Sequence, residues 1–371
     1  MKQGAQAVFL VRPAAFGFNQ ETASSNVFQT PSPGGADLDC KSRTEFDGLV
    51  RSLRDAGIRV LVTEDSPVPP KPDAVFPNNW LSTHEDGSLV LYPMQAPNRR
   101  RERRPGIVSE LGDDFKIRRV VDLTHHERAG RYLEGTGSLV LDHIGRRAYA
   151  AASIRTDPDL ARSWGETMGY QVEVFETRDA GGLPIYHTNV FMAIGTGWAV
   201  IGSDLIQGAS DRLEIPKRLR DSGRSVLELS PAQVADFAGN ILELTAPLGP
   251  AIVISRRGLR SLGPRGRRLL AQHGQIIPVA LDVIETVGGG GVRCMLAEIF
   301  LPPQADSRGG GLGRPLEFVE IVDRAPEMRN HDGAADHEAD AERLDDGFLG
   351  RSLAVQLIEM VTDAVVAAQN E

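Results

Sequence analysis

The residue types best suited to covalent chemistry in this chain are a cysteine, a histidine and two acids, each within a distinctive short sequence. Cys294 follows four consecutive glycines, Gly288 to Gly291, and is one of two cysteines in the chain. An ionised thiol is a strong nucleophile, and a glycine run lets the backbone approach a ligand closely. Most free cysteines are small buried hydrophobes, however, so Cys294 taken alone is only a weak sign of a nucleophile.

Three other segments place acids, amides or an imidazole close to the start of an apolar strand. Asp73 and Asn79 belong to the sequence PDAVFPNNW, and Glu134 precedes a Gly-x-Gly turn. His187 and Asn189 belong to the sequence YHTNV. Each segment alone is also compatible with a structural role, as an Asx turn, a strand start or a core histidine.

These segments recur with a regular spacing. The separations are 55, 53, 53 and 54 residues, measured between Asn79, Glu134, His187, Asn240 and Cys294. A repeat of near-constant length indicates radially stacked units. With the opening segment sharing a unit with the end of the domain, the repeat predicts a closed five-fold arrangement. Equivalent strand ends then converge on one axis, which would bring the acids, the imidazole and the thiol together.

The apolar pattern predicts that each unit reads strand, strand, helix, strand. The expected hairpins are 75–82 with 88–92, 137–141 with 147–151, 188–194 with 198–201, and 241–244 with 251–255. The expected helices are 45–56, 102–111, 158–168, 211–222 and 263–273, and the remaining strands are 7–11, 59–63, 118–123, 171–175, 225–229, 275–279 and 295–300. The aromatic and polar segment 14–35 is expected to cross a surface or to cover a pocket.

Composition divides the chain into a catalytic domain and a tail. Residues 1–303 form the predicted α/β propeller domain. Residues 304–347 are Gly-rich and then charged, which predicts a disordered linker. Residues 348–371 have helical apolar spacing and are expected to pack on the domain or on a second subunit. The sequence leaves that choice, and with it a homo-oligomer, open.

The overall composition excludes several classes of protein. The 371 residues carry a net charge of -9, which argues against a nucleic-acid-binding surface. No run of 18 apolar residues exists, so we expect no membrane span. Two cysteines suit a reducing compartment, and a cytoplasmic location is expected. The histidines lack the spacing of metal ligands, so no metal site is predicted.

The order of these motifs resembles the guanidine-modifying superfamily, which includes arginine deiminases, dimethylargininases and amidinotransferases and has a five-bladed α/β propeller. The shared motifs are D-x-x-F-x-x-[ND], E-G-x-G, H-x-[ND] and a Gly-rich cysteine near the end of the domain. Three strings, VRPAAFGFNQETASSNVFQ, DAVFPNNW and YHTNVFM, are most similar to the citrulline utilisation hydrolases. The resemblance covers about residues 7 to 303.

The resemblance implies roles for individual residues. It implies that Cys294 is the nucleophile and His187 the general acid and base. The substrate carboxylates would be Glu134 and Asp73. By their positions in the same pattern, Arg99 and Arg155 resemble the arginines that hold the substrate's own carboxylate. A forked guanidinium suits that role. For both, a solvated surface charge is the alternative.

Two positions differ from the deiminase pattern. This chain has Asn79 where deiminases carry aspartate, and Asn189 where they commonly carry it. Aspartate only accepts hydrogen bonds and suits a guanidinium, whereas asparagine also donates and suits a neutral ureido group. Extra buried carboxylates against a neutral ligand would leave unpaired charge. The two asparagines therefore shift the predicted substrate from arginine toward citrulline.

The predicted function is hydrolysis at the ureido or guanidino carbon of a free amino acid, with citrulline converted to ornithine, ammonia and carbon dioxide. The thiol is expected to lose its proton in an electropositive pocket, and no cofactor is required. The enzymatic alternatives are an arginine deiminase, a dimethylargininase and an arginine dihydrolase. An amino-acid-binding sensor or an assembly scaffold is the alternative from another class.

Overall fold

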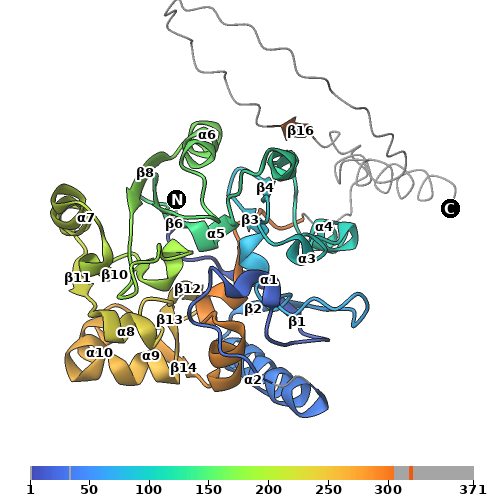
Figure 1. The fold of residues 1–371 in the computed structure, drawn as a ribbon, viewed down its shortest axis with the longest axis horizontal. Helices are drawn as coiled ribbons and strands as arrows, with labels where there is room; N and C mark the ends of the chain where they lie inside the picture. Colours follow the sequence, from blue (N-terminus) through green and yellow to red (C-terminus); the bar gives the residue numbers. More distant parts are fainter. Residues whose placement is uncertain (1, 33–34, 305–316, 321–371) are drawn as a thin grey trace, which may run out of the picture.

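Five small β-sheets surround a common centre in the computed structural model, which describes residues 2–32, 35–304 and 317–320. Figure 1 looks onto this ring, and the chain passes round it from blue through green and yellow to orange. Each sheet contains a central strand paired antiparallel on one side and parallel on the other. The predicted five-bladed α/β propeller is confirmed.

The blades follow the chain in order, with the first one completed by the last strand of the domain. The sheets have the strand orders β15-β1-β2, β16-β5-β4-β3, β6-β7-β8, β11-β10-β9 and β12-β13-β14. The strands are β1 (Ala7–Arg12), β2 (Arg59–Glu64), β3 (Leu81–Thr83), β4 (Ser88–Leu91), β5 (Arg119–Asp122), β6 (Leu139–Asp142), β7 (Arg147–Ala152), β8 (Gln171–Glu176), β9 (Met192–Ile194), β10 (Trp198–Ile201), β11 (Ser225–Glu228), β12 (Leu242–Ala246), β13 (Gly249–Ser255), β14 (Gln275–Val279), β15 (Ala297–Ile299) and β16 (Glu317–Glu320).

The longer helices lie on the outside of the ring (Figure 1). They bury one apolar face against the strands, as α6 does with Leu160, Trp164 and Met168. The helices are α1 (Gln20–Ala23), α2 (Ala36–Asp55), α3 (Pro97–Arg100), α4 (Pro105–Asp114), α5 (Gly135–Ser138), α6 (Pro158–Met168), α7 (Ala209–Asp221), α8 (Pro231–Ala235), α9 (Arg256–Ser261) and α10 (Gly263–Ala271).

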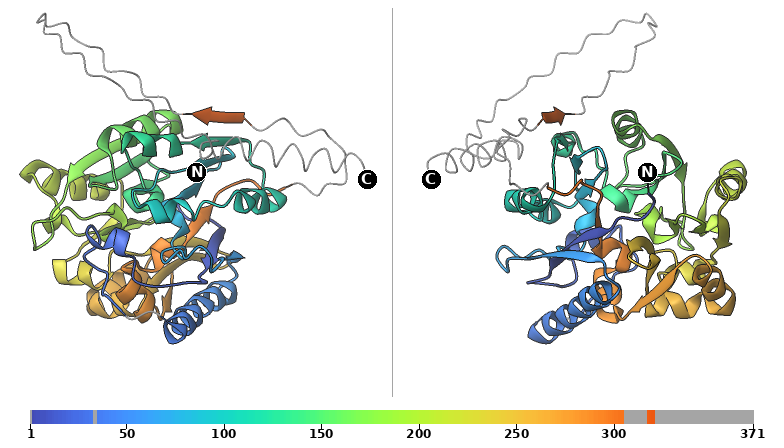
Figure 2. Two further views of the ribbon diagram at one scale, coloured as in Figure 1. Left: turned by 45° about the vertical axis from the view of Figure 1, so that its right-hand side comes forward. Right: turned by 180° about the vertical axis from the view of Figure 1, so that it is seen from behind.

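The ring is closed by pairing between the two ends of the domain. β1 runs antiparallel to β15, with Ala7 opposite Ile299, and parallel to β2, with Ala7 opposite Arg59. The blue and orange segments accordingly adjoin in Figures 1 and 2. The expectation that the opening segment shares a blade with the end of the domain is confirmed.

The inner strands are shorter than the sequence predicts. Strands were expected over 75–82 and 188–194, but β3 begins at Leu81 and β9 at Met192. A single 3₁₀ turn precedes each of them, over Pro77–Asn79 and over Thr188–Val190. The apolar pattern of these buried residues predicts a strand, but their backbone forms a turn at the centre of the ring.

One helix begins later than its apolar pattern predicts. The helix expected over 102–111 is α4, which starts at Pro105 because proline fits the first turn and has no N–H to donate within it. Glu102 lies outside the helix, and its two carboxylate oxygens accept hydrogen bonds from Arg99 at 2.9 and 3.0 Å.

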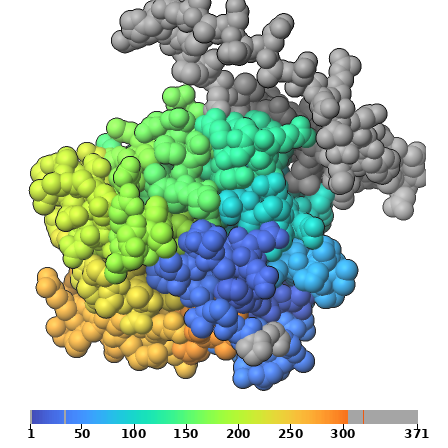
Figure 3. All heavy atoms as spheres, in the orientation of Figure 1, coloured from blue at the N-terminus to red at the C-terminus, as the bar shows by residue number. Residues whose placement is uncertain are grey.

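The N-terminal segment that follows β1 crosses one face of the ring. In Figure 3 its dark blue atoms occupy the middle of that face, between the teal, green and orange blades. The segment contains the short helix α1, whose N-cap Asn19 accepts a hydrogen bond from the backbone of Glu21. The prediction that residues 14–35 cross a surface or cover a pocket therefore has a definite location, above the centre of the ring.

Little of the C-terminal tail belongs to the described residues. β16 (Glu317–Glu320) lies within the segment predicted as a linker, and it adds a parallel strand beside β5. The linker prediction did not include this strand. The helix predicted over 348–371 lies outside the described residues and stays a prediction. Within the part of the chain that the structure describes, no helix has the length and apolar content needed to cross a membrane.

Two buried histidines predict that the fold weakens in acid. His84 lies beside Ser82 and His143 beside Tyr170, with ring nitrogen to hydroxyl distances of 3.0 and 2.7 Å. Burial lowers the pKa of His84 from 6.5 to about 4 and that of His143 to about 3. Below the unfolded pKa of 6.5 the unfolded chain binds protons that the native state does not, so its free energy falls relative to the native state.

We therefore expect the free energy of unfolding to decrease as the pH falls from 6.5 and to continue decreasing to about pH 4 for His84 and about pH 3 for His143. For His84 the total is on the order of 3 kcal/mol, since one pKa unit corresponds to about 1.4 kcal/mol. Melting temperatures between these pH values should fall less steeply in the double variant H84Q/H143Q. Equal slopes in variant and wild type would contradict the prediction.

Candidate active site

The residues that define the sequence repeat meet at the centre of the ring. Each lies in or beside a short turn that leads into the inner strand of one blade. All five are at most 3 % exposed, namely Asn79, Glu134, His187, Asn240 and Cys294. Convergence of equivalent strand ends, predicted from the repeat, is thus what the structure shows.

One pocket on the face covered by the N-terminal segment collects most of the predicted site residues. Gly288, Gly289 and Gly290, which precede the cysteine, form part of its wall together with Phe76, Tyr186 and Asn26. Six of the eight predicted site residues also line it, namely Cys294, His187, Asp73, Asn79, Arg99 and Arg155. The other two, Glu134 and Asn189, lie directly behind His187 and Cys294 and contact them.

His187 and Glu134 form a buried hydrogen-bonded pair. Nε2 of His187 lies 2.9 Å from Oε2 of Glu134, whose other oxygen accepts from the backbone N–H of Gln95 at 3.0 Å. Burial alone would raise the pKa of Glu134, but Arg155, the hydrogen bond from His187 and Arg99 outweigh it and lower that pKa to about 2. Because an ionised carboxylate only accepts, Nε2 carries the proton of this hydrogen bond.

Burial also lowers the pKa of His187 to about 4, and the neighbouring Glu134 opposes this only in part. Near neutral pH the imidazole is therefore uncharged, with a proton on Nε2 and a basic Nδ1. A neutral imidazole with one nitrogen held by a carboxylate can accept a proton during a reaction and then return it.

The glycine pattern after Glu134 has a steric cause. A Cβ atom on Gly137 would lie 2.6 Å from Nδ2 of Asn79 and 2.7 Å from the ring of His187. Any other residue would push these two side chains out of position. The Gly-x-Gly sequence is thus required by close packing between three blades.

Arg99 and Arg155 are buried, each with 2 % of its side chain exposed, so neither is a solvated surface charge. Nη1 of Arg99 donates to Oδ1 of Asn79 at 2.8 Å, while its Nε and Nη2 bind Glu102. Arg155 donates to Oγ of Ser25 at 2.7 Å and lies 4.8 Å from the centre of the Tyr186 ring. The guanidinium of Arg99 is therefore occupied by protein groups on all three nitrogens, whereas Nη1 of Arg155 lies 3.7 Å from Glu134, beyond hydrogen-bond distance.

The thiol of Cys294 is surrounded by amides. Its Sγ lies 3.3 Å from Nδ2 of Asn240, 3.6 Å from Nδ2 of Asn189 and 3.7 Å from Oδ1 of Asn189. Burial raises the pKa of the thiol above its ordinary value, and the hydrogen bond from Asn240 opposes this only in part. The electropositive pocket expected to ionise the thiol is not what this structure shows. Because burial raises its pKa, the thiol keeps its proton near neutral pH.

The N-terminal segment supplies polar groups that the sequence analysis did not assign to the site. Nδ2 of Asn19 donates to Oδ2 of Asp73 at 2.7 Å, and the hydroxyl of Thr22 donates to the same oxygen at 3.3 Å. Asn26 and Gln29 donate to the carbonyl oxygen of Gly288 at 3.4 and 3.1 Å. This segment therefore contacts two parts of the pocket wall, Asp73 and the glycine run that precedes Cys294.

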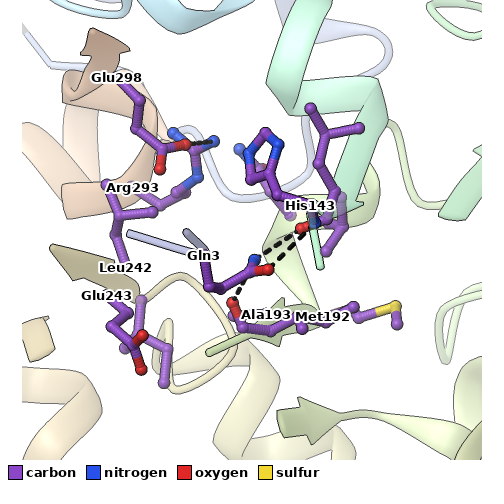
Figure 4. Close-up of a pocket in the computed structure, with 13 residues that line it drawn as sticks. Gln3, His143, Met192, Ala193, Leu242, Glu243, Arg293 and Glu298 are labelled. Atoms are coloured by element: carbon purple, nitrogen blue, oxygen red, sulfur yellow. Dashed lines mark hydrogen bonds and ion pairs between the residues drawn. The ribbon is translucent and has the colours of Figure 1, made fainter. Parts of the chain in front are cut away.

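A second cavity is lined in part by Asn189, and Figure 4 shows Arg293 and Glu298 among its other lining residues. Its polar groups are paired within the protein. Arg293 binds Glu298 at 2.9 Å, and Nε2 of Gln3 donates to two backbone carbonyl oxygens at 2.8 and 3.1 Å. Neither Cys294 nor His187 lines this cavity. Among the described residues, no group of three or more His, Cys, Asp or Glu side chains is placed to hold a metal ion.

Comparison with known proteins places this geometry among related folds. A family model for eukaryotic N,N dimethylarginine dimethylhydrolase matches residues 12–301. The N-terminal domain of ArgZ, an arginine dihydrolase of cyanobacteria solved as a cysteine-to-serine mutant bound to substrate, is 16 % identical, with a TM-score of 0.60 over 80 % of this chain and 99 % of that one.

Two further solved structures share the fold. AgrE, solved as a cysteine-to-alanine mutant with L-arginine, is 16 % identical, with a TM-score of 0.63 over 81 % of this chain and 41 % of that one. A mutant of the dimethylarginine dimethylhydrolase DDAH from Pseudomonas aeruginosa complexed with citrulline is 16 % identical, with a TM-score of 0.57 over 80 % of this chain and 100 % of that one. A sequence search of curated proteins found no match.

Proposed function

The chain belongs to the eukaryotic N,N dimethylarginine dimethylhydrolase family of the guanidine-modifying superfamily, and we propose that it is a cysteine-dependent hydrolase that acts on the ureido carbon of citrulline. Its products are ornithine, ammonia and carbon dioxide. The nucleophile is Cys294, the general acid and base is His187, and Glu134 and Asp73 bind the N–H groups of the substrate.

The balance of charge in the pocket is the observation that carries this choice of substrate. Among the described residues that line the pocket or lie directly behind it, two arginines face three acids, of which Glu102, bound by Arg99, has a pKa that burial raises to about 7. Glu134 lies 3.7 Å from Arg155 and 3.8 Å from Arg99, and Asp73 lies 3.7 Å from Arg99. A guanidinium would add a buried positive charge beside acids that already face arginines, which is costly, whereas a ureido group is neutral.

Asp73 retains an acceptor for the substrate. Its Oδ2 accepts from Asn19 and Thr22, while Oδ1 is buried and has no hydrogen-bond partner among the described residues. A buried acceptor without a partner costs free energy, which a substrate N–H would recover. Nη1 of Arg155 is the better placed guanidinium nitrogen for the α-carboxylate, because all three nitrogens of Arg99 already donate to protein groups.

The protonation states near neutral pH define the order of steps. Sγ of Cys294 attacks the ureido carbon while its proton passes to the neutral imidazole of His187. The imidazolium then protonates the terminal nitrogen as its C–N bond breaks, which releases ammonia and leaves a thiocarbamate on the sulfur. Water, deprotonated by His187, cleaves the S–C bond and restores the thiol. The carbamate that leaves decomposes to ornithine and carbon dioxide.

The test is incubation of the purified chain with citrulline, arginine or dimethylarginine in separate reactions, with assays for ornithine, citrulline and ammonia. We expect equal amounts of ornithine and ammonia from citrulline. Accumulation of citrulline from arginine or from dimethylarginine, with no ornithine formed from citrulline, would replace the proposal with a deiminase or a dimethylargininase. Binding of citrulline without turnover would indicate a sensor.

The sequence analysis favours contact of Asn79 and Asn189 with a neutral ureido group. The two side chains differ in their hydrogen bonds. Both groups of the Asn79 amide are occupied, since its oxygen accepts from Arg99 and its nitrogen donates to Asn78 at 3.0 Å. Asn189 donates one hydrogen to the carbonyl of Thr136 at 3.1 Å and directs the rest of its amide toward Sγ. Asn189 is therefore the better candidate for contact with the reacting group.

We expect N189D to lower citrulline turnover about ten- to a hundredfold, because the new carboxylate loses a donor and adds a buried charge beside the sulfur. N79D is the matched control and should lose less, because a carboxylate there still accepts from Arg99. The measurement is kcat/KM for citrulline, with thermal melts to confirm folding. Equal losses in the two variants would show that Asn189 has no special contact with the reacting group.

A further inference from the structure

Asn240 occupies the fifth blade at the repeat position that holds a functional residue in the other blades. It lies just before β12, is 1 % exposed, and its backbone N–H donates to the carbonyl of Phe237 at 3.0 Å. Neither the family motifs nor the spacing assigned it a role. Its side chain nevertheless reaches the sulfur of Cys294.

The hydrogen bonds of Asn240 fix which end of its amide faces the sulfur. Oδ1 accepts from the backbone N–H of Arg293 at 2.9 Å, and Nδ2 donates to the backbone oxygen of Asn189 at 2.9 Å. The reversed amide would place a donor against the N–H of Arg293 and an oxygen against the carbonyl of Asn189. The second hydrogen of Nδ2 is therefore left for Sγ of Cys294, at 3.3 Å.

The glycine run before Cys294 fits closely round this amide. A Cβ atom on Gly291 would lie 2.6 Å from Oδ1 of Asn240. The loop that carries the nucleophile thus packs directly on Asn240, and the amide cannot rotate without displacing that loop. Asn189 differs, because both ends of its amide lie at similar and longer distances from the sulfur, 3.6 and 3.7 Å.

We propose that Asn240 is a further catalytic residue, which donates a hydrogen bond from Nδ2 to Sγ of Cys294 and stabilises the negative charge that the sulfur gains as its proton leaves. A thiolate in a buried site needs such a donor, because water does not solvate it there. The inference rests on the proposed function only in taking Cys294 as the nucleophile.

The test measures ionisation of the thiol without any substrate. The parent is the full chain with C40S, which removes the exposed second cysteine, and the readout is the rate of alkylation of Cys294 by iodoacetamide as a function of pH. Loss of a hydrogen bond to a charged group should raise the thiol's pKa by about one to two units in N240A. Alkylation near neutral pH should then be about ten- to a hundredfold slower, and the difference should disappear at high pH, where both thiols are ionised.

Gln3 offers a matched control. It is also a buried amide that donates to two backbone oxygens and accepts from a backbone N–H, that of His143, but it makes no contact with the sulfur. We expect Q3A to lose stability and to keep the parent's alkylation profile. Should N240A fail to fold, the isosteric N240D takes its place, since it keeps the acceptor for Arg293 and lacks the donor to Sγ.

Three outcomes separate the interpretations. A profile that shifts to higher pH supports the inference. An unchanged profile, or a rate reduced by one factor at every pH, overturns it, because the latter reports altered access and not ionisation. A shifted profile in a protein that hydrolyses neither citrulline nor an arginine derivative would uphold the role of Asn240 and reject the proposed function.

Discussion

The variant C294S is expected to lose about 10⁴-fold or more of the citrulline-hydrolysing activity while it keeps the native fold. Burial already raises the pKa of the thiol, and a serine hydroxyl in the same place would be far harder to deprotonate. The side chains are nearly the same size, and the hydroxyl can still accept from Asn240, so the melting temperature should change little. Ornithine release and a thermal melt measure the two quantities.

The natural control for this variant is C40S, because Cys40 is exposed and lies in α2, away from the pocket. It should retain wild-type turnover. Turnover near the wild-type rate in C294S would show that Cys294 is not the nucleophile. The acids and arginines of the pocket would then be interpreted as a binding site.

The second large effect is expected for H187Q, which should lower kcat by about 10²- to 10⁴-fold. Glutamine can donate a hydrogen bond to Glu134, but it cannot take up the thiol proton or deliver one to the departing nitrogen. The loss should appear in kcat more than in KM, because the substrate's contacts with Asp73 and Arg155 remain. Added imidazole should restore part of the activity if proton transfer is the missing function.

H84Q is the matched control for H187Q. His84 is also fully buried with a pKa lowered to about 4, yet it hydrogen-bonds to Ser82 within the second blade and does not line the pocket. Its replacement should alter stability in acid and leave turnover intact. Equal activity losses in the two variants would indicate that H187Q acts through folding and not through proton transfer.

The sequence repeat predicted both the ring and the meeting point of the functional residues, because a constant spacing places equivalent residues at equivalent strand ends. Asn240 lies at the same repeat position as Glu134, His187 and Cys294, so the spacing also predicted that it would lie at the centre of the ring. The sequence analysis gave it no role, because an asparagine alone does not indicate a particular reaction. Its contact with the sulfur depends on the conformation of the loop before Cys294, which the spacing does not determine.

Other features of the site depend on tertiary contacts between distant segments. Asn19 reaches Asp73, and Arg155 reaches Ser25, because the N-terminal segment crosses the ring. No local pattern encodes these pairs. The protonation state of Cys294 is a further example, since it follows from the burial of the thiol. A sequence shows the charges but not which of them neutralise one another.

The pairing of β1 with β15 affects when the domain can fold during its synthesis on the ribosome. β1 is the first strand of the domain to be synthesised, but its antiparallel partner, Ala297–Ile299, follows Cys294 and is the last strand of its blade to be made. Until then one edge of β1 has no partner, and its apolar side chains, Val8 and Leu10 among them, lack part of their final packing. An unpaired apolar edge tends to associate with other chains. The same contact that closes the ring therefore makes the nascent chain depend on rapid release or on chaperones, and it delays assembly of the pocket until the domain is complete.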